Sequence, residues 1–155
     1  MKVGTDAVLL GAWANPEGVN KILDIGTGTG IIALMLAQKS DTIIDAIDID
    51  KNSCKQAQEN VDSSKWNERI FIHYSSLQDF AEENNGPYEL IISNPPYFID
   101  SSKSSEAKRT TARHADVLTY EHLLNGVLKL LSPKGRFYII PVSYTHLTLP
   151  TNREV

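Results

Sequence analysis

The sequence contains one cysteine, Cys54, among 155 residues, and it has no long apolar run. A single thiol excludes an internal disulfide and a zinc site built on paired cysteines, so we expect Cys54 to be a small core residue. The roughly 18 to 20 consecutive apolar residues of a membrane span do not occur, and the start lacks the charged-then-apolar order of a signal peptide. We therefore expect a cytoplasmic protein with no membrane contact.

An excess of positive charge is also missing, because the formal net charge is -4. A protein that binds nucleic acid through overall charge is strongly basic, so any nucleic acid would have to bind a local patch here. The four histidines include no pair at metal-ligand spacing with a carboxylate nearby. The sequence therefore predicts no metal site.

Short apolar runs alternate with segments of helical periodicity along the whole chain. This alternation is typical of one α/β domain whose parallel sheet is covered on both faces. The five expected strands are Lys21–Ile25, Thr42–Asp48, Arg69–Tyr74, Glu89–Ser93 and Gly135–Pro141. The expected helices are Ala7–Trp13, Ile31–Gln38, a helix N-capped by Asp50 that carries Cys54, Ala57 and Val61, and a helix from near Thr119 that is stopped by the segment Ser132 to Gly135.

A glycine-rich turn follows the first expected strand and opens an apolar helix. Its three alternate glycines let the backbone turn tightly and approach a ligand, and the helix start offers N–H groups without intrahelical acceptors. Asp48 ends the second strand, where a carboxylate accepts the hydroxyls of a ribose. These residues predict a site for an adenosine-containing cofactor: Asp24, Gly26, Gly28 and Gly30 in the turn, and Asp48.

Two kinds of cofactor fit the turn. The segment Gly28–Ala33 matches the G-x-G-x-x-A form of the dinucleotide fingerprint. S-adenosylmethionine is favoured by Asp24, because a carboxylate attracts the cationic amino end of that cofactor and repels a pyrophosphate. It is also favoured by Ile31, which stands where G-x-G-x-x-G requires its last glycine. A turn whose glycines serve only packing is the third interpretation.

The motif SNPPYF, residues 93–98, directly follows the fourth expected strand. Ligands of an open parallel sheet bind beyond the carboxyl ends of its strands, so the motif is expected to face the cofactor. The Asn94 side-chain oxygen and the Pro95 carbonyl can accept the two N–H groups of a conjugated amine, which directs its lone pair toward a methyl donor. Pro96 completes the rigid segment, and Tyr97 or Phe98 offers a face for a stacked base. Alternatively, the motif is only a turn.

The glycine turn and Asp48 resemble those of the class I S-adenosylmethionine-dependent methyltransferases, a Rossmann-like family with an open, mostly parallel, doubly wound sheet. The Asn-Pro-Pro-Tyr motif resembles that of members that methylate amines. The N-terminal segment Lys2–Ala14 makes the chain similar to the bacterial tRNA1(Val) adenine-N6 methyltransferases. The resemblance implies N6-methylation of an adenine in the anticodon loop of a valine tRNA. It also implies cofactor contacts from Thr5, Asp24, Gly26, Gly28, Gly30, Asp48 and Asn94, with Ser76 and Leu77 beside the adenine, where many members carry an acidic residue.

This resemblance also implies that both termini are cut. We expect residues 1–141 to form an incomplete methyltransferase domain that lacks its C-terminal strands. Residues 142–155 resemble a translated sequencing adapter, with an ordinary final strand and tail as the alternative. Missing strands would expose a sheet edge, so we expect the chain as written to be weakly stable and inactive.

The segment after the motif is rich in basic residues, and we expect tRNA phosphates to bind its loop 103–114, with a scattered solvated charge as the alternative. We expect the enzyme to be a monomer. Competing hypotheses are a protein glutamine-amide methyltransferase or a DNA adenine methyltransferase, each of which would need a further domain. A nicotinamide-dependent oxidoreductase would leave Asn94 unexplained. The last alternative is an inactive fragment or a module that binds the cofactor or RNA without catalysis.

Overall fold

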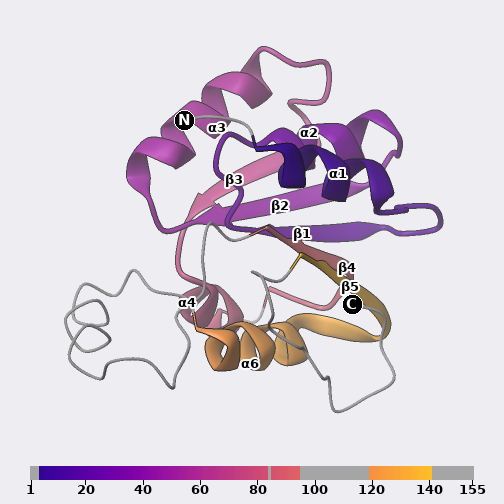
Figure 1. Ribbon diagram of the computed structural model, residues 1–155, viewed down its shortest axis with the longest axis vertical. Helices are drawn as coiled ribbons and strands as arrows, with labels where there is room; N and C mark the ends of the chain where they lie inside the picture. Colours follow the sequence, from indigo (N-terminus) through magenta and orange to yellow (C-terminus); the bar gives the residue numbers. More distant parts are fainter. Residues whose placement is uncertain (1–3, 84, 95–118, 141–155) are drawn as a thin grey trace.

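The structure is a computed structural model that describes residues 4–83, 85–94 and 119–140 (Figure 1). Helices and strands alternate along these residues, as the sequence predicts. The helices are α1 (Thr5–Trp13), α2 (Ile31–Gln38), α3 (Lys51–Asp62), α4 (Leu77–Glu82) and α6 (Tyr120–Leu130). The strands are β1 (Lys21–Ile25), β2 (Ile43–Asp48), β3 (Ile70–Tyr74), β4 (Tyr88–Ser93) and β5 (Leu131–Ile139).

The described strands form one parallel sheet in the order β3-β2-β1-β4-β5. The α/β prediction is therefore confirmed. The first strand lies in the centre, and the strand order reverses between β1 and β4. Ile25 of β1 pairs with Ile47 of β2 and with Ser93 of β4, so the carboxyl ends of these three strands lie level. Ligands of open parallel sheets bind at such a reversal, so this edge is the place to look for a site.

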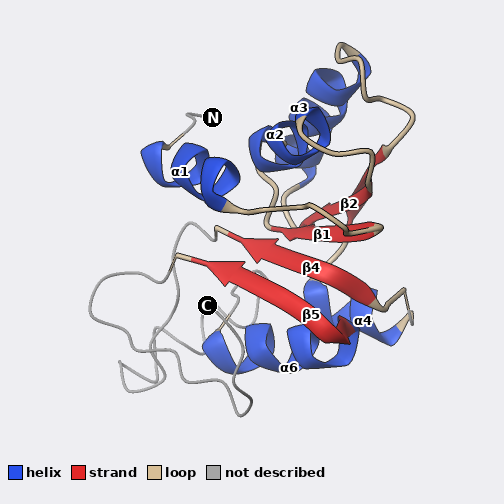
Figure 2. Cartoon of the chain, turned by 90° about the vertical axis from the view of Figure 1, so that its right-hand side faces the viewer, coloured by secondary structure: helices blue, strands red, loops and turns tan. Residues whose placement is uncertain are grey.

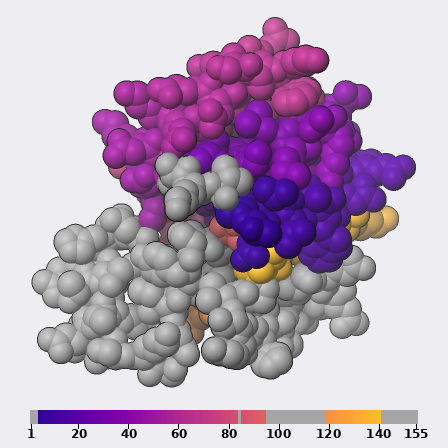
Figure 3. Space-filling model, turned by 45° about the horizontal axis from the view of Figure 1, so that its top comes forward, coloured from indigo at the N-terminus to yellow at the C-terminus, as the bar shows by residue number. Residues whose placement is uncertain are grey.

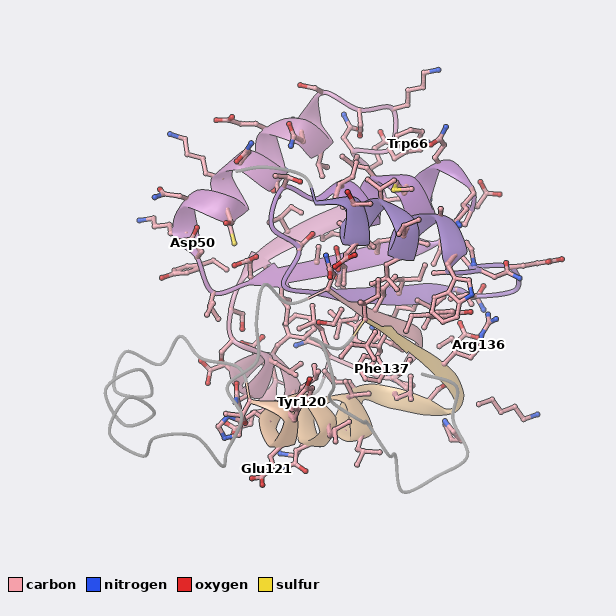
Figure 4. All side chains as sticks on the ribbon, viewed as in Figure 1. Asp50, Trp66, Tyr120, Glu121, Arg136 and Phe137 are labelled. Carbon is pink, nitrogen blue, oxygen red and sulfur yellow. The ribbon has the colours of Figure 1, made fainter. Side chains whose placement is uncertain are left out.

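Helices cover both faces of the sheet, as Figure 2 shows. The helices α1, α2 and α3 contribute to one apolar core on the side of Ile22 and Ile44. The helices α4 and α6 contribute to a second core with Leu23 and Phe137, and Figure 4 shows Phe137 between β5 and α6. Strands buried on both faces need apolar residues in succession, which explains the continuous apolar runs of β1 and β4.

Helix α1 packs against α2 and contributes Ala7 and Leu10 to the core on the side of Ile22. Its Trp13 meets Tyr138 of β5 edge to face, with ring centroids 4.9 Å apart. Figure 3 shows α1 in indigo at the surface beside the yellow end of β5. Trp13 is nevertheless 57% exposed. None of the described helices is long and apolar enough to cross a membrane.

The local signals in the sequence determine several boundaries. The expected bounds of β1 and α2 are confirmed. Asp50 caps α3 by accepting a hydrogen bond from the Ser53 N–H, and Figure 4 shows it at the start of that helix. Thr119 caps α6 in the same way through the N–H of His122. Cys54 is buried, as expected, and burial raises the pKa of its thiol to about 11, so the thiol stays neutral.

Two elements differ from the sequence prediction by more than one or two residues at a boundary. Helix α4 was not predicted, because its six residues are too few to show a helical period. The start of β5 was predicted wrongly at Gly135, because Pro133 and Gly135 indicate a turn. In the structure β5 begins at Leu131, directly after α6, and its pairing with β4 shifts through a bulge between Tyr88 and Leu90. A bulge tolerates proline and glycine inside a strand.

A partly buried hydrogen-bond network joins β2, β3 and β4. The Asp45 carboxylate accepts a hydrogen bond from the Tyr88 hydroxyl at 2.7 Å and lies 2.8 Å from Nε2 of His73. Burial alone would raise the pKa of Asp45, but the hydrogen bonds from His73 and Tyr88 outweigh it, so the pKa lies below the ordinary value. The carboxylate therefore stabilises the fold above the unfolded-state pKa of about 3.9, and this contribution is lost as the pH falls through the lower folded-state pKa.

Replacing Asp45 with asparagine is expected to lower the free energy of unfolding by about 2 kcal/mol at pH 7, because charge-assisted hydrogen bonds are lost in a partly buried place. The variant should also lose less stability than the wild type between pH 5 and pH 3. Urea denaturation at these pH values measures both effects. Asp41→Asn, at an exposed carboxylate nearby, is the control. Equal acid sensitivity of Asp45→Asn and the wild type would contradict this account.

Candidate functional site

Apart from Thr5 and Asp24, the residues predicted to bind the cofactor lie at or just beyond the carboxyl ends of four adjacent strands. Strands β3, β2, β1 and β4 are neighbours in the sheet, and all of them run in the same direction. The structure therefore brings together segments that are far apart in the sequence. These segments are Gly26–Gly30 after β1, Asp48 at the end of β2, Ser76 and Leu77 after β3, and Asn94 after β4.

The glycine turn is attached to the end of β2. The N–H groups of Gly26 and Thr27 both donate to the Ile47 carbonyl, at 2.9 and 3.0 Å. Gly30 is the N-cap of α2 with φ +85°, a left-handed conformation that favours glycine. A Cβ on Gly30 would also lie 3.4 Å from the Cβ of Ala57 in α3. The turn thus presents the start of α2, with the positive end of its helix dipole, at the edge of the sheet.

Asp48 holds the glycine turn and keeps capacity for a ligand. Its Oδ2 accepts a hydrogen bond from the N–H of Gly28, and its Oδ1 accepts one from the N–H of Asp50, both at 2.9 Å. An ionised carboxylate has about four lone-pair positions, so about two remain for further donors. The side chain is partly exposed. A diol such as a ribose has the donors that this arrangement can accept.

Asp24 lies on β1 just before the glycine turn and is fully buried. Its Oδ2 accepts a hydrogen bond of 2.7 Å from the Thr27 hydroxyl, whereas its Oδ1 has no hydrogen-bond partner among the described residues. Burial, and less strongly the nearby Asp48, raise the pKa of Asp24 to about 7, against the opposing effects of Thr27 and the Ala33 N–H. The sequence suggested a simple carboxylate, and the structure instead gives a carboxyl group that titrates near neutral pH.

Asn94 leaves the sheet beside the glycine turn. The preceding residue, Ser93, pairs with Ile25 across the strand reversal, and its hydroxyl donates to the Ile25 carbonyl at 3.1 Å. Asn94 directly follows Ser93, and Gly26 directly follows Ile25, so both residues leave neighbouring strands at the same level. Asn94 is half-buried. The first two residues of the motif, Ser93 and Asn94, therefore lie beside the start of the glycine turn. The other three predicted catalytic residues, Pro95, Pro96 and Tyr97, lie outside the described residues.

The remaining predicted contacts differ in accessibility. Ser76 is the N-cap of α4, where its hydroxyl oxygen accepts the Asp79 N–H at 3.1 Å and keeps its own O–H available to donate. The Leu77 side chain is buried in the core formed with α6, so only its backbone groups can contact a ligand. Thr5 is the exposed first residue of α1.

Residues 3–151 match the family described as the methyltransferase small domain. The chain belongs to this family. Among its curated relatives, a protein from Parabacteroides distasonis is 54% identical over 140 residues, which are 90% of this chain and 59% of the relative. A protein from Trichodesmium erythraeum is 50% identical over 150 residues, 94% of this chain and 63% of the relative. Both are named tRNA1(Val) (adenine(37)-N6)-methyltransferase, and the chain spans about 60% of their length.

Solved structures agree on the fold. The structure of TrmN from Thermus thermophilus superposes with a TM-score of 0.66 at 24% identity, over 88% of this chain and 37% of that one. A ribosomal protein L11 methylase from Lactobacillus delbrueckii gives a TM-score of 0.55 at 22% identity, over 86% of this chain and 57% of that one. These likenesses show that the methyltransferase small domain of this chain has the Rossmann-like methyltransferase fold.

Two residues of this methyltransferase small domain that act within the site were not identified from the sequence. Thr27 stands between glycines and three residues after Asp24, so its bond to the carboxyl group depends on the turn conformation. Ser93 stands next to Asn94, but its acceptor is 68 residues away and is known only when β1 and β4 are seen to be neighbours. For both Thr27 and Ser93, the signal in the sequence was a polar side chain next to a predicted site residue.

Proposed function

We propose that this chain is the cofactor-binding and catalytic part of a cytoplasmic, monomeric enzyme. The enzyme transfers a methyl group from S-adenosylmethionine to N6 of an adenine in the anticodon loop of a valine tRNA. The carrying observation is the position of Asn94, which leaves β4 beside the glycine turn at the strand reversal. The names of the relatives at 50% identity and above support the choice of substrate.

The residues at the sheet edge fit S-adenosylmethionine. The turn Gly26–Gly30 allows close approach, Asp48 has lone pairs free for the ribose hydroxyls, and the buried Asp24 keeps one oxygen without a partner among the described residues. The charges also agree, because the Asp48 carboxylate, and Asp24 in its ionised form, favour a cationic ligand over a pyrophosphate. Ser76 and the backbone of Leu77 would contact the adenine, and Thr5 the carboxylate of the methionine part. Once bound, this cofactor supplies an electrophilic methyl group for direct displacement.

The chain's contribution to the chemistry is positioning. An exocyclic amine conjugated to a base has a delocalised lone pair and is a weak nucleophile. The Asn94 side-chain oxygen and the Pro95 carbonyl would accept its two N–H groups, which turns the lone pair out of the ring plane and toward the cofactor site. Pro96 would keep the segment rigid, and Tyr97 or Phe98 would stack on the base. Correct alignment alone accounts for much of the rate of such a transfer.

The basic residues at 103–113 would hold tRNA phosphates. Replacing Arg109 and Arg113 with glutamine is expected to weaken tRNA binding and to reduce the slope of log affinity against log salt by about one for each phosphate that is no longer neutralised. Fluorescence titrations with tRNA from about 50 to about 300 mM salt, a range chosen to resolve the slope, measure both quantities. Lys65→Gln with Lys134→Gln removes the same charge from exposed positions and serves as the control. An unchanged salt slope in the arginine variant would contradict the assignment.

The substrate class is tested with labelled S-adenosylmethionine. The full-length protein is offered tRNA, a DNA oligonucleotide and a cytosolic protein extract in parallel reactions. We expect label in tRNA only, because the relatives at 50% identity and above are named tRNA methyltransferases and the basic residues at 103–113 would bind tRNA phosphates. Label in protein alone would instead identify a glutamine-amide methyltransferase, and label in DNA alone a DNA adenine methyltransferase. No transfer with retained cofactor binding would favour a non-catalytic module.

A further inference from the structure

Thr27 and Asp24 form a buried pair in which the two oxygens of the carboxyl group have different surroundings. The Thr27 hydroxyl donates to one carboxyl oxygen of Asp24, at 2.7 Å, and the other oxygen has no hydrogen-bond partner among the described residues. Thr27 itself is only 5% exposed. A carboxyl group with one bonded and one unbonded oxygen has a defined place for a proton, which is the unbonded Oδ1.

The surroundings of Asp24 decide whether its carboxyl group is protonated or ionised. Strand β2 contributes the carboxylate of Asp48, which disfavours a second negative charge, and β4 contributes the apolar Ile92 opposite Asp24. Helix α2 contributes the N–H of Ala33, and α1 covers this face with apolar residues. Among the described residues, only Thr27 and Ala33 favour the ionised form, so the carboxyl group carries a proton for part of the time at neutral pH, with its pKa at about 7.

We propose that Thr27 is a positioning residue that holds Asp24 ready to release its Oδ1 proton when a cationic cofactor binds at the glycine turn. This inference rests on the proposed function, since the cation is the ammonium or sulfonium group of S-adenosylmethionine. On binding, the O–H bond of the carboxyl group breaks and the proton passes to the buffer, while the remaining negative charge faces the cation. Thr27 stabilises that charge by its hydrogen bond to Oδ2.

Cofactor binding and ionisation of Asp24 are coupled, and the pH dependence of the affinity shows the direction of this coupling. Ionisation favours the bound state, so affinity for the cofactor should rise with pH as Asp24 loses its proton. With a free-state pKa of about 7, the ionised fraction of Asp24 increases about eightfold between pH 6.0 and pH 7.5, and affinity should rise with it once the titration of the ligand's own ammonium group is subtracted. After the same subtraction, binding at pH 7 should release about half a proton. Calorimetric titration of the full-length protein with S-adenosylhomocysteine and with S-adenosylmethionine, in two buffers of different ionisation enthalpy, counts this proton.

Variants at Thr27 separate positioning from packing. Thr27→Val removes the hydroxyl, so the pH midpoint of binding should move upward by about one unit. At equal pH the titration of the ligand cancels in the comparison with the wild type. The variant should therefore bind about eightfold more weakly at pH 6.5 but less than about twofold more weakly at pH 8.5. Thr27→Ser keeps the donor and should follow the wild type at both pH values.

Thr29→Val, in the same turn, is the matched control, and it should change affinity by the same factor at both pH values. A loss in Thr27→Val that is equal at pH 6.5 and 8.5 would overturn the positioning role, as would wild-type binding without proton release. Should Thr27→Val not fold, the proton count of the wild type and the pH dependence of Thr27→Ser still decide. Absence of cofactor binding at every pH would overturn the proposed function together with this inference, whereas binding without pH dependence overturns this inference alone.

Discussion

Replacing Asn94 with alanine is expected to lower the rate of methyl transfer to tRNA by about 10²-fold or more at saturating substrates. The substitution removes the side-chain oxygen that would accept one N–H of the target amine, and the lone pair then no longer points at the methyl donor. Single-turnover transfer of labelled methyl by the full-length protein measures the effect. Affinity for the cofactor should fall much less than the rate, because the glycine turn and Asp48 are untouched.

The control for this variant is Asn125→Ala, at an exposed asparagine of α6. It should transfer methyl groups at the wild-type rate. A rate for Asn94→Ala within threefold of the wild type, in a protein that still unfolds at the same temperature, would mean that the motif after β4 is only a turn. The catalytic assignment of Pro95, Pro96 and Tyr97 would then lose its support as well.

The second large effect is expected at Asp48. Asp48→Ala should weaken binding of S-adenosylmethionine by about 10²-fold, because two hydrogen bonds from a ribose to a charged acceptor are removed, each worth at least about 1.5 kcal/mol. The same change also leaves the N–H of Gly28 without its acceptor and loosens the turn. Equilibrium dialysis with the labelled cofactor gives the affinity directly.

Asp62→Ala removes an exposed carboxylate from the end of α3 and should leave cofactor affinity unchanged. The rate of transfer by Asp48→Ala should recover when the cofactor concentration is raised, because Asn94 remains in place. A variant that binds the cofactor with wild-type affinity would exclude the ribose role. A rate that stays low at saturating cofactor would assign Asp48 to the chemical step instead.

The elements that the sequence predicts best are those with strong local signals. The glycines after β1 have positive φ, which other residues rarely adopt. Asp50 and Thr119 have the side-chain oxygen that an N-cap requires. The apolar run of α2 indicates a helix that packs against the core. These features depend on residues within one turn of each other. The short helix α4 has such a signal too, in the Ser76 cap, but its six residues give too little periodicity to be recognised.

Features that depend on strand neighbours were not available from the sequence. The general rule for open parallel sheets predicted Asn94 at the cofactor edge, but no local pattern states that β4 lies beside β1 or that Ser93 pairs with Ile25. The same holds for the network of Asp45, His73 and Tyr88, whose members come from three strands. The raised pKa of Asp24 likewise depends on burial and on Asp48 across the sheet, whereas the sequence shows only an acidic residue before a turn.

The central claim is that the nitrogen methylated is N6 of an adenine in tRNA. It is tested most directly by digesting methylated tRNA to nucleosides and identifying the product by mass spectrometry. A parallel reaction with Asn94→Ala gives the background amount of methylated nucleoside. The account predicts N6-methyladenosine as the product formed by the wild type and strongly reduced in the variant. Formation of 1-methyladenosine, 5-methylcytidine or a ribose-methylated nucleoside in its place would contradict it.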